Sequence, residues 1–107
     1  MVEKRFEFAK TDSKVIERII EDDNVAINHM VFNKGDKTPE HYANSNVYMI
    51  VARGQVTLAL NDQEPTTYPA GSILGVPHRT KMNVSNQSDD TLEFFVVKAP
   101  GPRTMQN

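Results

Sequence analysis

Few side chains in this chain of 107 residues have the chemistry of a ligand or a catalyst. The three histidines are His29, His41 and His78, and an imidazole can bind a metal ion or transfer a proton near neutral pH. The absence of cysteine excludes disulfides, zinc–thiolate sites, iron–sulfur clusters and thiol nucleophiles. Closely spaced acidic pairs occur only in segments that we interpret as solvated turns. The histidines are therefore the starting point for any metal or acid–base site.

Glycine and proline positions recur at a suggestive spacing around one of these histidines. Gly35 precedes His41 by six positions, and Gly54 follows it by thirteen. The second half of the chain has a further set of spaced residues: Pro69, Gly71, Pro77, Met82 and Asn86. Each position alone is a weak signal, but their joint spacing within a sequence rich in β-branched residues is fairly specific.

This spacing resembles the two motifs of the cupin superfamily. The first motif, G-x5-H-x-H-x(3,4)-E-x6-G, is matched by Gly35, His41 and Gly54. The second, P-x-G followed by Pro, His and x3-N, is matched at Pro69, Gly71, Pro77 and Asn86. Segment 44–50 and the ending at 98–100 also resemble a group of small single-domain cupins of unassigned role. The resemblance implies an all-β jelly-roll barrel, the cupin-type double-stranded β-helix.

Three of the four metal-ligand positions that this resemblance implies carry other residues. Cupin enzymes bind Fe, Mn, Ni, Cu or Zn through two histidines and a glutamate of the first motif and a histidine of the second. Here His41 keeps one position, whereas Ala43, Val47 and Met82 stand at the other three, or Tyr48 replaces Val47 if the spacer is one residue longer. Alkyl groups offer no lone pair, and a thioether suits Cu(I) at best. We therefore expect no metal cofactor.

A rebuilt metal site is the alternative. Glu40, His41, Tyr48 and His78 are the candidate ligands for it. Neighbouring residues of a regular strand point to opposite faces, which disfavours the pairing of Glu40 with His41. If any residue binds a metal ion, the sequence favours His41.

The resemblance and the alternation of strand residues together predict an apolar pocket with one imidazole near its mouth. The predicted ligand-binding residues are His41, Ala43, Val47, Met49, Met82, Met30, Phe32 and Phe94. A pocket of this kind suits a small, largely apolar ligand, and methionine side chains adapt to varied shapes. The same side chains could instead fill the barrel completely. His29, among apolar strand residues, is predicted to be a structural histidine whose hydrogen bonds are satisfied.

The apolar residues themselves favour strands over helices. Val and Ile number seventeen against four Leu, and β-branched side chains suit a pleated surface. We expect more than half of the residues in strands, within one domain over 1–107, a barrel core at about 25–98 and a flexible tail at 99–107. Predicted strands cover 5–8, 14–20, 24–32, 47–52, 55–60, 66–68, 73–76, 80–84 and 91–98. A short helix beginning at Ser13 is the alternative for 14–20.

Two pairs of these strands are predicted to form hairpins. The turn at Arg53 and Gly54 predicts that 47–52 pairs with 55–60. The segments 80–84 and 91–98 are predicted to form the last pair. In the final strand, Leu92, Phe94 and Val96 are expected to face inward, because the opposite choice would bury Glu93 without a partner.

Composition limits the partners. Twelve Lys and Arg against 14 Asp and Glu give a net charge of −2, which argues against nucleic acid. The longest apolar run, near 48–52, is far shorter than the roughly twenty residues of a membrane helix, and the first residues lack the pattern of a secretory signal. We expect a cytoplasmic protein and, from the resemblance and the need to cover edge strands, a homodimer.

Three functional hypotheses follow. The first is a metal-free barrel that binds a small molecule or has a regulatory role. The second is a metal-dependent enzyme of the dioxygenase or isomerase type, with a non-standard site around His41. The third is a purely structural or interaction protein with a filled barrel. No phosphate-binding loop or nucleophile elbow supports another catalytic class.

Overall fold

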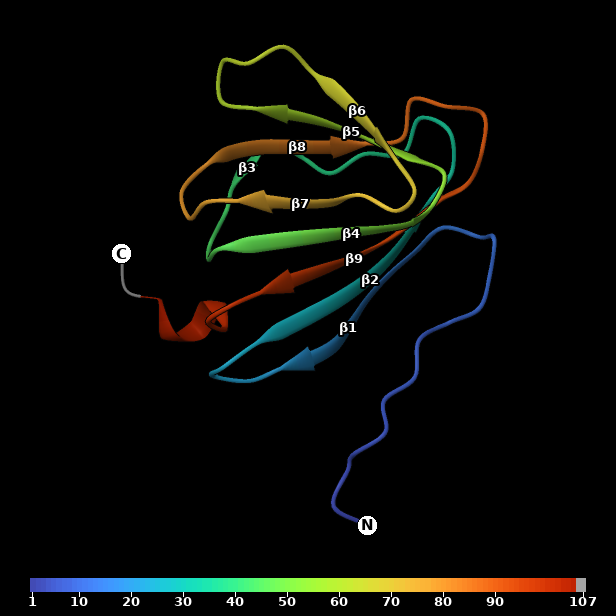
Figure 1. Cartoon of the computed structure of the whole chain (residues 1–107). Helices are drawn as coiled ribbons and strands as arrows, with labels where there is room; N and C mark the ends of the chain where they lie inside the picture. The colour runs from blue at the N-terminus through green and yellow to red at the C-terminus, as the bar shows by residue number, and fades with distance from the viewer. Residues whose placement is uncertain (106–107) are drawn as a thin grey trace.

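The computed structural model describes residues 1–105, and its regular secondary structure consists almost entirely of strands (Figure 1). The strands are β1 (Val15–Glu21), β2 (Ala26–Phe32), β3 (His41–Tyr42), β4 (Val47–Arg53), β5 (Gln55–Leu60), β6 (Thr66–Pro69), β7 (Ile73–Val76), β8 (Lys81–Ser85) and β9 (Leu92–Lys98), followed by the 3-10 helix η1 (Pro102–Thr104). Strands hold 48% of the described residues, so the expectation of more than half is narrowly missed. The predicted all-β class is confirmed. No helix within residues 1–105 is long and apolar enough to cross a bilayer.

The strands form two antiparallel sheets that enclose one apolar core. The five-stranded sheet has the order β1-β2-β9-β4-β7, and the four-stranded sheet has the order β3-β8-β5-β6. Figure 1 shows the four-stranded sheet above the five-stranded one. Both sheets contribute to the same core cluster, for example Phe94 of β9 and Leu58 of β5. This arrangement is the jelly roll that the resemblance implies.

Strict alternation along the central strands creates the inner face of the five-stranded sheet. In β4, Val47, Met49 and Val51 are buried, while the residues between them are exposed. In β9, the predicted inward residues Leu92, Phe94 and Val96 are all buried. A strand with this pattern has one register that buries its apolar set, because a slip by one residue would expose all of it.

The first predicted hairpin is wrong, although both of its strands exist. β4 pairs with β7 and β9, while β5 pairs with β6 and β8 in the other sheet. Gly54 lies between them with φ of +73°, and a Cβ atom there would overlap the carbonyl oxygen of Thr91. The turn therefore carries the chain from one sheet to the other. The sequence of a turn between two alternating segments is the same whether the two strands pair in one sheet or belong to different sheets.

The second predicted pairing is wrong for the same reason. β8 lies between β3 and β5, whereas β9 lies between β2 and β4. The polar segment from Ser85 to Asp90 crosses between the sheets. Asn86 holds this crossing, since its buried amide donates to the carbonyl oxygens of Phe32 and Asp90. The asparagine of the second motif thus fixes a loop.

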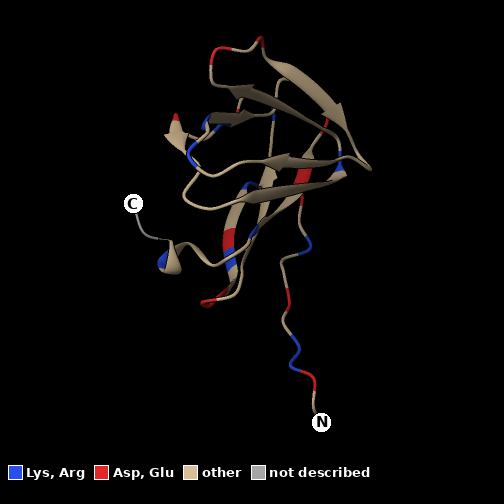
Figure 2. Ribbon diagram, turned by 60° about the vertical axis from the view of Figure 1, so that its left-hand side comes forward, with Lys and Arg blue, Asp and Glu red and all other residues tan. Residues whose placement is uncertain are grey.

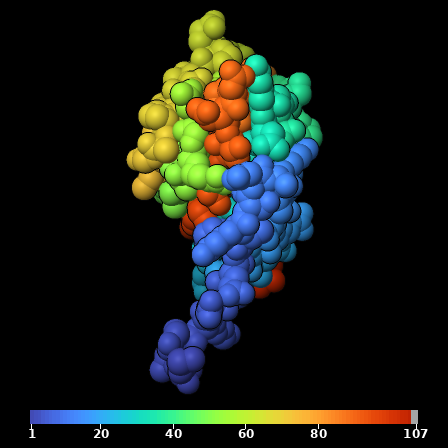
Figure 3. Space-filling model, turned by 90° about the vertical axis from the view of Figure 1, so that its right-hand side faces the viewer, coloured from blue at the N-terminus to red at the C-terminus, as the bar shows by residue number. Residues whose placement is uncertain are grey.

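The N-terminal region contains one strand fewer than predicted. Residues 5–8 form no strand: the first residues project from the body of the molecule (Figure 3), and Phe8 instead packs its ring against His29 and Phe95 of the five-stranded sheet. The predicted strand at 14–20 is present as β1, and the helix alternative is wrong. β1 and β2 form an antiparallel hairpin. Its turn is held by Oδ1 of Asp22, which accepts hydrogen bonds from the backbone amides of Asn24 and Val25. The bonds from Val25 and Asn24 lower the pKa of the Asp22 carboxyl.

The predicted flexible tail is docked over residues 99–105. The amide of Gly101 donates to the carbonyl oxygen of Asp23, and Arg103 forms an ion pair with the carboxylate of the same aspartate at 2.6 Å. A Cβ at Gly101 would overlap the backbone of Asp22. The Pro-Gly-Pro sequence ends β9 as expected, but it also packs η1 against the β1–β2 turn. Residues 106–107 of the predicted tail lie outside the described part of the chain.

Candidate functional site

The inner faces of three neighbouring strands form the floor and wall of a small cavity. β9 pairs with β2 and β4, so that Val96 lies opposite both Asn28 and Met49. Lys98 lies opposite Ala26 and Val47 at the end of the same inward row. Directly paired residues project from the same side of a sheet. The row therefore passes from apolar side chains in the core to one lysine at the mouth.

The cavity measures about 60 Å³. Its lining consists of Asn28, Met30, Thr38, His41, Ala43, Asn44, Val47, Met49, Met82, Val96 and Lys98. Six of the eight residues predicted for the pocket therefore meet here: Met30, His41, Ala43, Val47, Met49 and Met82. This volume is far below the roughly 300 Å³ of a pocket for a drug-sized ligand, so it can hold only a short group.

The other two predicted residues lie deeper. Phe32 and Phe94 are completely buried, and their rings meet edge to face with centroids 5.3 Å apart. They belong to the packed core and are absent from the cavity lining. Aromatic side chains of this size fill the space between the sheets, which closes the barrel below the cavity.

His41 stands at the mouth on the short strand β3, opposite Met82 of β8. Its Nδ1 atom lies 2.9 Å from the carbonyl oxygen of Pro39. Because a carbonyl can only accept, Nδ1 is the donor, and a neutral imidazole then has its lone pair on Nε2. The side chain is exposed. It therefore offers one nitrogen acceptor to a molecule at the mouth.

The donor set around His41 does not fit the metal site of a cupin enzyme. The positions of the other three ligands hold Ala43, Val47 and Met82, which are all buried and apolar. Within residues 1–105, no group of three or more His, Cys, Asp or Glu side chains could hold a metal ion. One imidazole and soft thioethers do not make a site for Fe, Mn, Ni or Zn.

The ligands of the alternative site are also dispersed. Glu40 lies 3.7 Å from the ammonium group of Lys81, and Tyr48 is exposed on the outer side of β4. The backbone amide of His78 donates to Oδ1 of Asn46. None of Glu40, Tyr48 and His78 lines the cavity that contains His41. The geometry gives this rebuilt site no support.

Lys98 is a site residue that the sequence analysis missed. Burial lowers the pKa of its ammonium group, and the nearby charge of Arg18 lowers it further, while Glu21 opposes the shift. No Asp or Glu side chain within residues 1–105 lies within ion-pair distance of it. The sequence could have predicted this position, because the alternation through Phe94 and Val96 places residue 98 on the same inner face.

A second, polar cavity of about 250 Å³ adjoins the first. It is lined by Arg18, Glu21, Ala26, Asn28, Asn44, Lys98, Pro102 and Arg103. Asn28, Asn44 and Lys98 line both cavities. Figure 2 shows a basic segment on η1 and both basic and acidic segments on the strand beside it. The docked C-terminal segment thus completes a polar chamber beside the apolar one.

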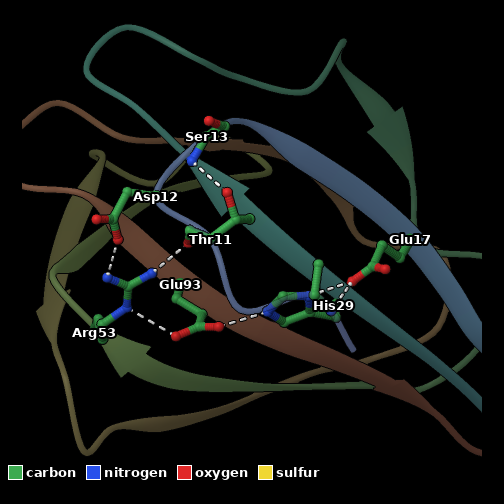
Figure 4. A network of polar contacts seen from close by, with 8 residues as sticks. Thr11, Asp12, Ser13, Glu17, His29, Arg53 and Glu93 are labelled. Atoms are coloured by element: carbon green, nitrogen blue, oxygen red, sulfur yellow. Dashed lines mark hydrogen bonds and ion pairs between the residues drawn. The ribbon is translucent and has the colours of Figure 1, made fainter. Parts of the chain in front are cut away.

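The outer face of the five-stranded sheet carries a separate polar network (Figure 4). His29 is fully buried, with Nδ1 2.7 Å from Glu17 and Nε2 2.6 Å from Glu93. Glu93 also accepts from Nε of Arg53, whose Nη1 lies 2.7 Å from the carboxylate of Asp12. Burial alone would raise the pKa of Glu93, but the hydrogen bonds from His29 and Arg53 outweigh it and lower this pKa.

This network is structural, as predicted for His29. The rings of Phe8 and Phe95 lie against the imidazole, with centroids 4.7 and 4.9 Å away. The backbone amide of Ala9 donates to Glu17, and this bond, followed by that from His29, lowers the pKa of Glu17. All polar side-chain atoms that are buried within residues 1–105 have a partner. The network therefore attaches residues 8–12 to the sheet.

Comparison with known proteins supports the architecture. An uncharacterized protein of Methanocaldococcus jannaschii is 45% identical over 106 residues, which is 98% of this chain and 91% of that protein. A crystal structure from the same organism, described as an RmlC-like cupin family protein with a double-stranded β-helix fold, has a TM-score of 0.93 and 46% identity, and covers 96% of this chain and 95% of that one.

More distant structures share the fold alone. A cupin superfamily protein of Desulfitobacterium hafniense has a TM-score of 0.73 at 14% identity, with 87% of this chain and 83% of that chain covered. A double-stranded β-helix protein of Klebsiella pneumoniae has a TM-score of 0.75 at 16% identity, with 88% and 83% covered. The profile of the cupin domain family matches residues 28–98. This chain therefore belongs to the cupin domain family.

Proposed function

We propose that this cupin is a metal-free protein that binds a small molecule at the mouth of its barrel. The observation that carries the proposal is the pair of adjoining cavities, one apolar and one polar, that share Asn28, Asn44 and Lys98. Ligand sites commonly combine apolar walls with a few polar groups that fix orientation. The donor set around His41 supports binding without a metal ion, and the likeness to uncharacterized relatives favours no particular reaction.

The first experiment measures metal and ligand in the same preparation. Untagged protein, purified without oxygen, is analysed for Fe, Mn, Ni, Cu and Zn, and we expect substoichiometric amounts that do not change in His41→Ala. Stoichiometric metal that disappears in this variant would overturn the metal-free proposal in favour of an enzyme with a site around His41. His78→Ala is the matched control, because His78 does not line the cavity.

The second experiment separates a binding barrel from a filled one. Thermal-shift screening with small acids, sugars and aromatic compounds should find reproducible stabilisation by at least one class, since a ligand that binds only the folded state raises the melting temperature. A uniform lack of stabilisation across these classes, together with unchanged electron density in soaked crystals, would favour the structural role.

We further propose that the protein is a cytoplasmic homodimer. The support for the dimer is a set of exposed apolar side chains on the outer face of the β4–β7 pair. Tyr48, Ile50 and Ile73 are exposed there, and Ile50 lies directly opposite Ile73. Adjacent exposed apolar residues near a sheet edge are typical of a contact surface. Light scattering should give twice the mass of one chain, and Ile73→Lys should reduce it.

A further inference from the structure

The two adjoining cavities differ in chemistry, and Lys98 lies where they meet. The apolar cavity is surrounded by the side chains of Met30, Met49 and Met82. The polar cavity is surrounded by basic and amide side chains of β1, β2, β9 and the C-terminal segment. A molecule that occupied both would need a polar end and a short apolar end.

Among the residues that the structure describes, one cation at the polar cavity, Lys98, has no ion-pair partner. Arg103 is paired with Asp23 at 2.6 Å, and Arg18 lies 3.8 Å from Glu21. Lys98 has no such pair among the residues that the structure describes. It is also half-buried, and burial of an ammonium group without a counter-charge is unfavourable. An anionic ligand would supply the missing charge.

Building on the proposed binding function, we propose that the ligand class is a small aliphatic monocarboxylate whose carboxylate lies beside Lys98 and whose short chain enters the methionine-lined cavity. Asn28 and Asn44 line both chambers, and their amide groups are suited to hold the carboxylate oxygens. The volume of about 60 Å³ limits the chain to a few carbon atoms.

A monoanion fits this arrangement better than a phosphate. A phosphate carries close to two charges and requires several cationic or amide donors. Here Arg18 and Arg103 already face carboxylates, and Glu21 lines the same cavity. Within residues 1–105, the single ammonium group at this cavity that lacks an ion pair therefore matches one negative charge. The methionine side chains would leave an inorganic anion without favourable contacts on one side.

The test compares ligands of nearly equal size that differ in charge or chain length. Calorimetric titration of the full chain uses butanoate, its neutral analogue butanamide, acetate and inorganic phosphate. We expect butanoate to bind about tenfold more tightly than butanamide, because hydrogen bonds to a charged group are roughly twice as strong as those between neutral groups. Acetate should bind more weakly than butanoate, since it lacks the buried methylene groups.

Variants locate the carboxylate. Lys98→Met should reduce the affinity for butanoate at least about tenfold and leave the affinity for butanamide unchanged. Lys98→Arg should retain part of the preference for butanoate over butanamide. Lys34→Met is the matched control, because Lys34 is exposed and paired with Asp89, and neither residue lines either cavity. Circular dichroism confirms that each variant is folded.

The outcomes separate this inference from the proposed function. Equal binding of butanamide and butanoate, or unchanged butanoate affinity in Lys98→Met, overturns the charge assignment but leaves a small-molecule site in place. Preferential binding of phosphate also overturns the assignment. If no probe binds and the screen above finds no other ligand, both proposals fail.

Discussion

The Nε2 atom of His29 lies 2.6 Å from Oε2 of Glu93, so that β2 and β9 are joined by a side-chain bond between residues 64 positions apart. The other nitrogen of the ring is bonded to Glu17 of β1. One buried imidazole therefore connects three consecutive strands of the five-stranded sheet. Each ring nitrogen is thus within hydrogen-bond distance of one carboxylate.

Replacement of this histidine should be strongly destabilising. His29→Ala removes a fully buried ring together with its two hydrogen bonds and its contacts with Phe8 and Phe95, and removal of a large buried side chain costs about 2–5 kcal/mol. We expect a loss of this size in the free energy of unfolding, measured by urea denaturation. His78→Ala is the matched control, with an expected change below roughly 0.5 kcal/mol. Similar losses in both variants would contradict the structural role of His29.

Stability should also depend on pH through the two glutamates of this network. The pKa values of Glu17 and Glu93 are lowered from 4.5 in the folded chain. A lowered folded pKa stabilises the protein above the unfolded value, and this contribution disappears as the pH falls through the folded value. The urea concentration at the midpoint of unfolding should therefore decrease as the pH is lowered below about 4.5.

The double variant Glu17→Gln and Glu93→Gln isolates this contribution. It should be less stable than the wild type at pH 7 and should lose less stability on acidification. Glu7→Gln is the control, because Glu7 is exposed and pairs only with Arg5 within the described residues. If the free energy of unfolding depended on pH in the same way in the double variant and the wild type, other groups would govern acid unfolding.

The crossing between the sheets at Gly54 should tolerate no side chain. Gly54 and Gly35 both have a positive φ, but a Cβ at Gly35 would meet nothing within 4 Å, whereas one at Gly54 would overlap Thr91. Gly35→Ala should cost about 1–2 kcal/mol from backbone strain alone. We expect Gly54→Ala to cost several kcal/mol, and urea denaturation measures both. Equal costs would mean that the loop at Thr91 moves freely.

Metal binding should return when the replaced ligand positions are restored. The triple variant Ala43→His, Val47→Glu and Met82→His adds three donors to His41 in the barrel. We expect it to bind about one Co²⁺ or Zn²⁺ per chain, measured by calorimetry and visible absorption, because imidazole and carboxylate suit these ions. Removal of His41 from this variant should weaken binding by more than tenfold. A folded variant without metal affinity would show that the backbone around β3 also differs from that of a metal cupin.

Much of the local structure followed from the order of the residues. Alternation of apolar and polar residues predicted β4 and β9 and the inward side of each, because a pleated strand has a period of two. The spacing around His41 identified the family, and the alkyl and thioether groups at positions 43, 47 and 82 are the basis for the prediction that no metal cofactor is bound.

Pairing between distant strands was decided by the tertiary structure. The sequence near Gly54 predicts a turn between two strands, but it does not say whether they stay in one sheet or divide between two, since both arrangements bury the same side chains. The partners of His29 lie 12 and 64 positions away, beyond any local pattern. The polar chamber at Lys98 likewise forms only where η1 docks beside β1 and β2, because a cavity requires walls from several segments.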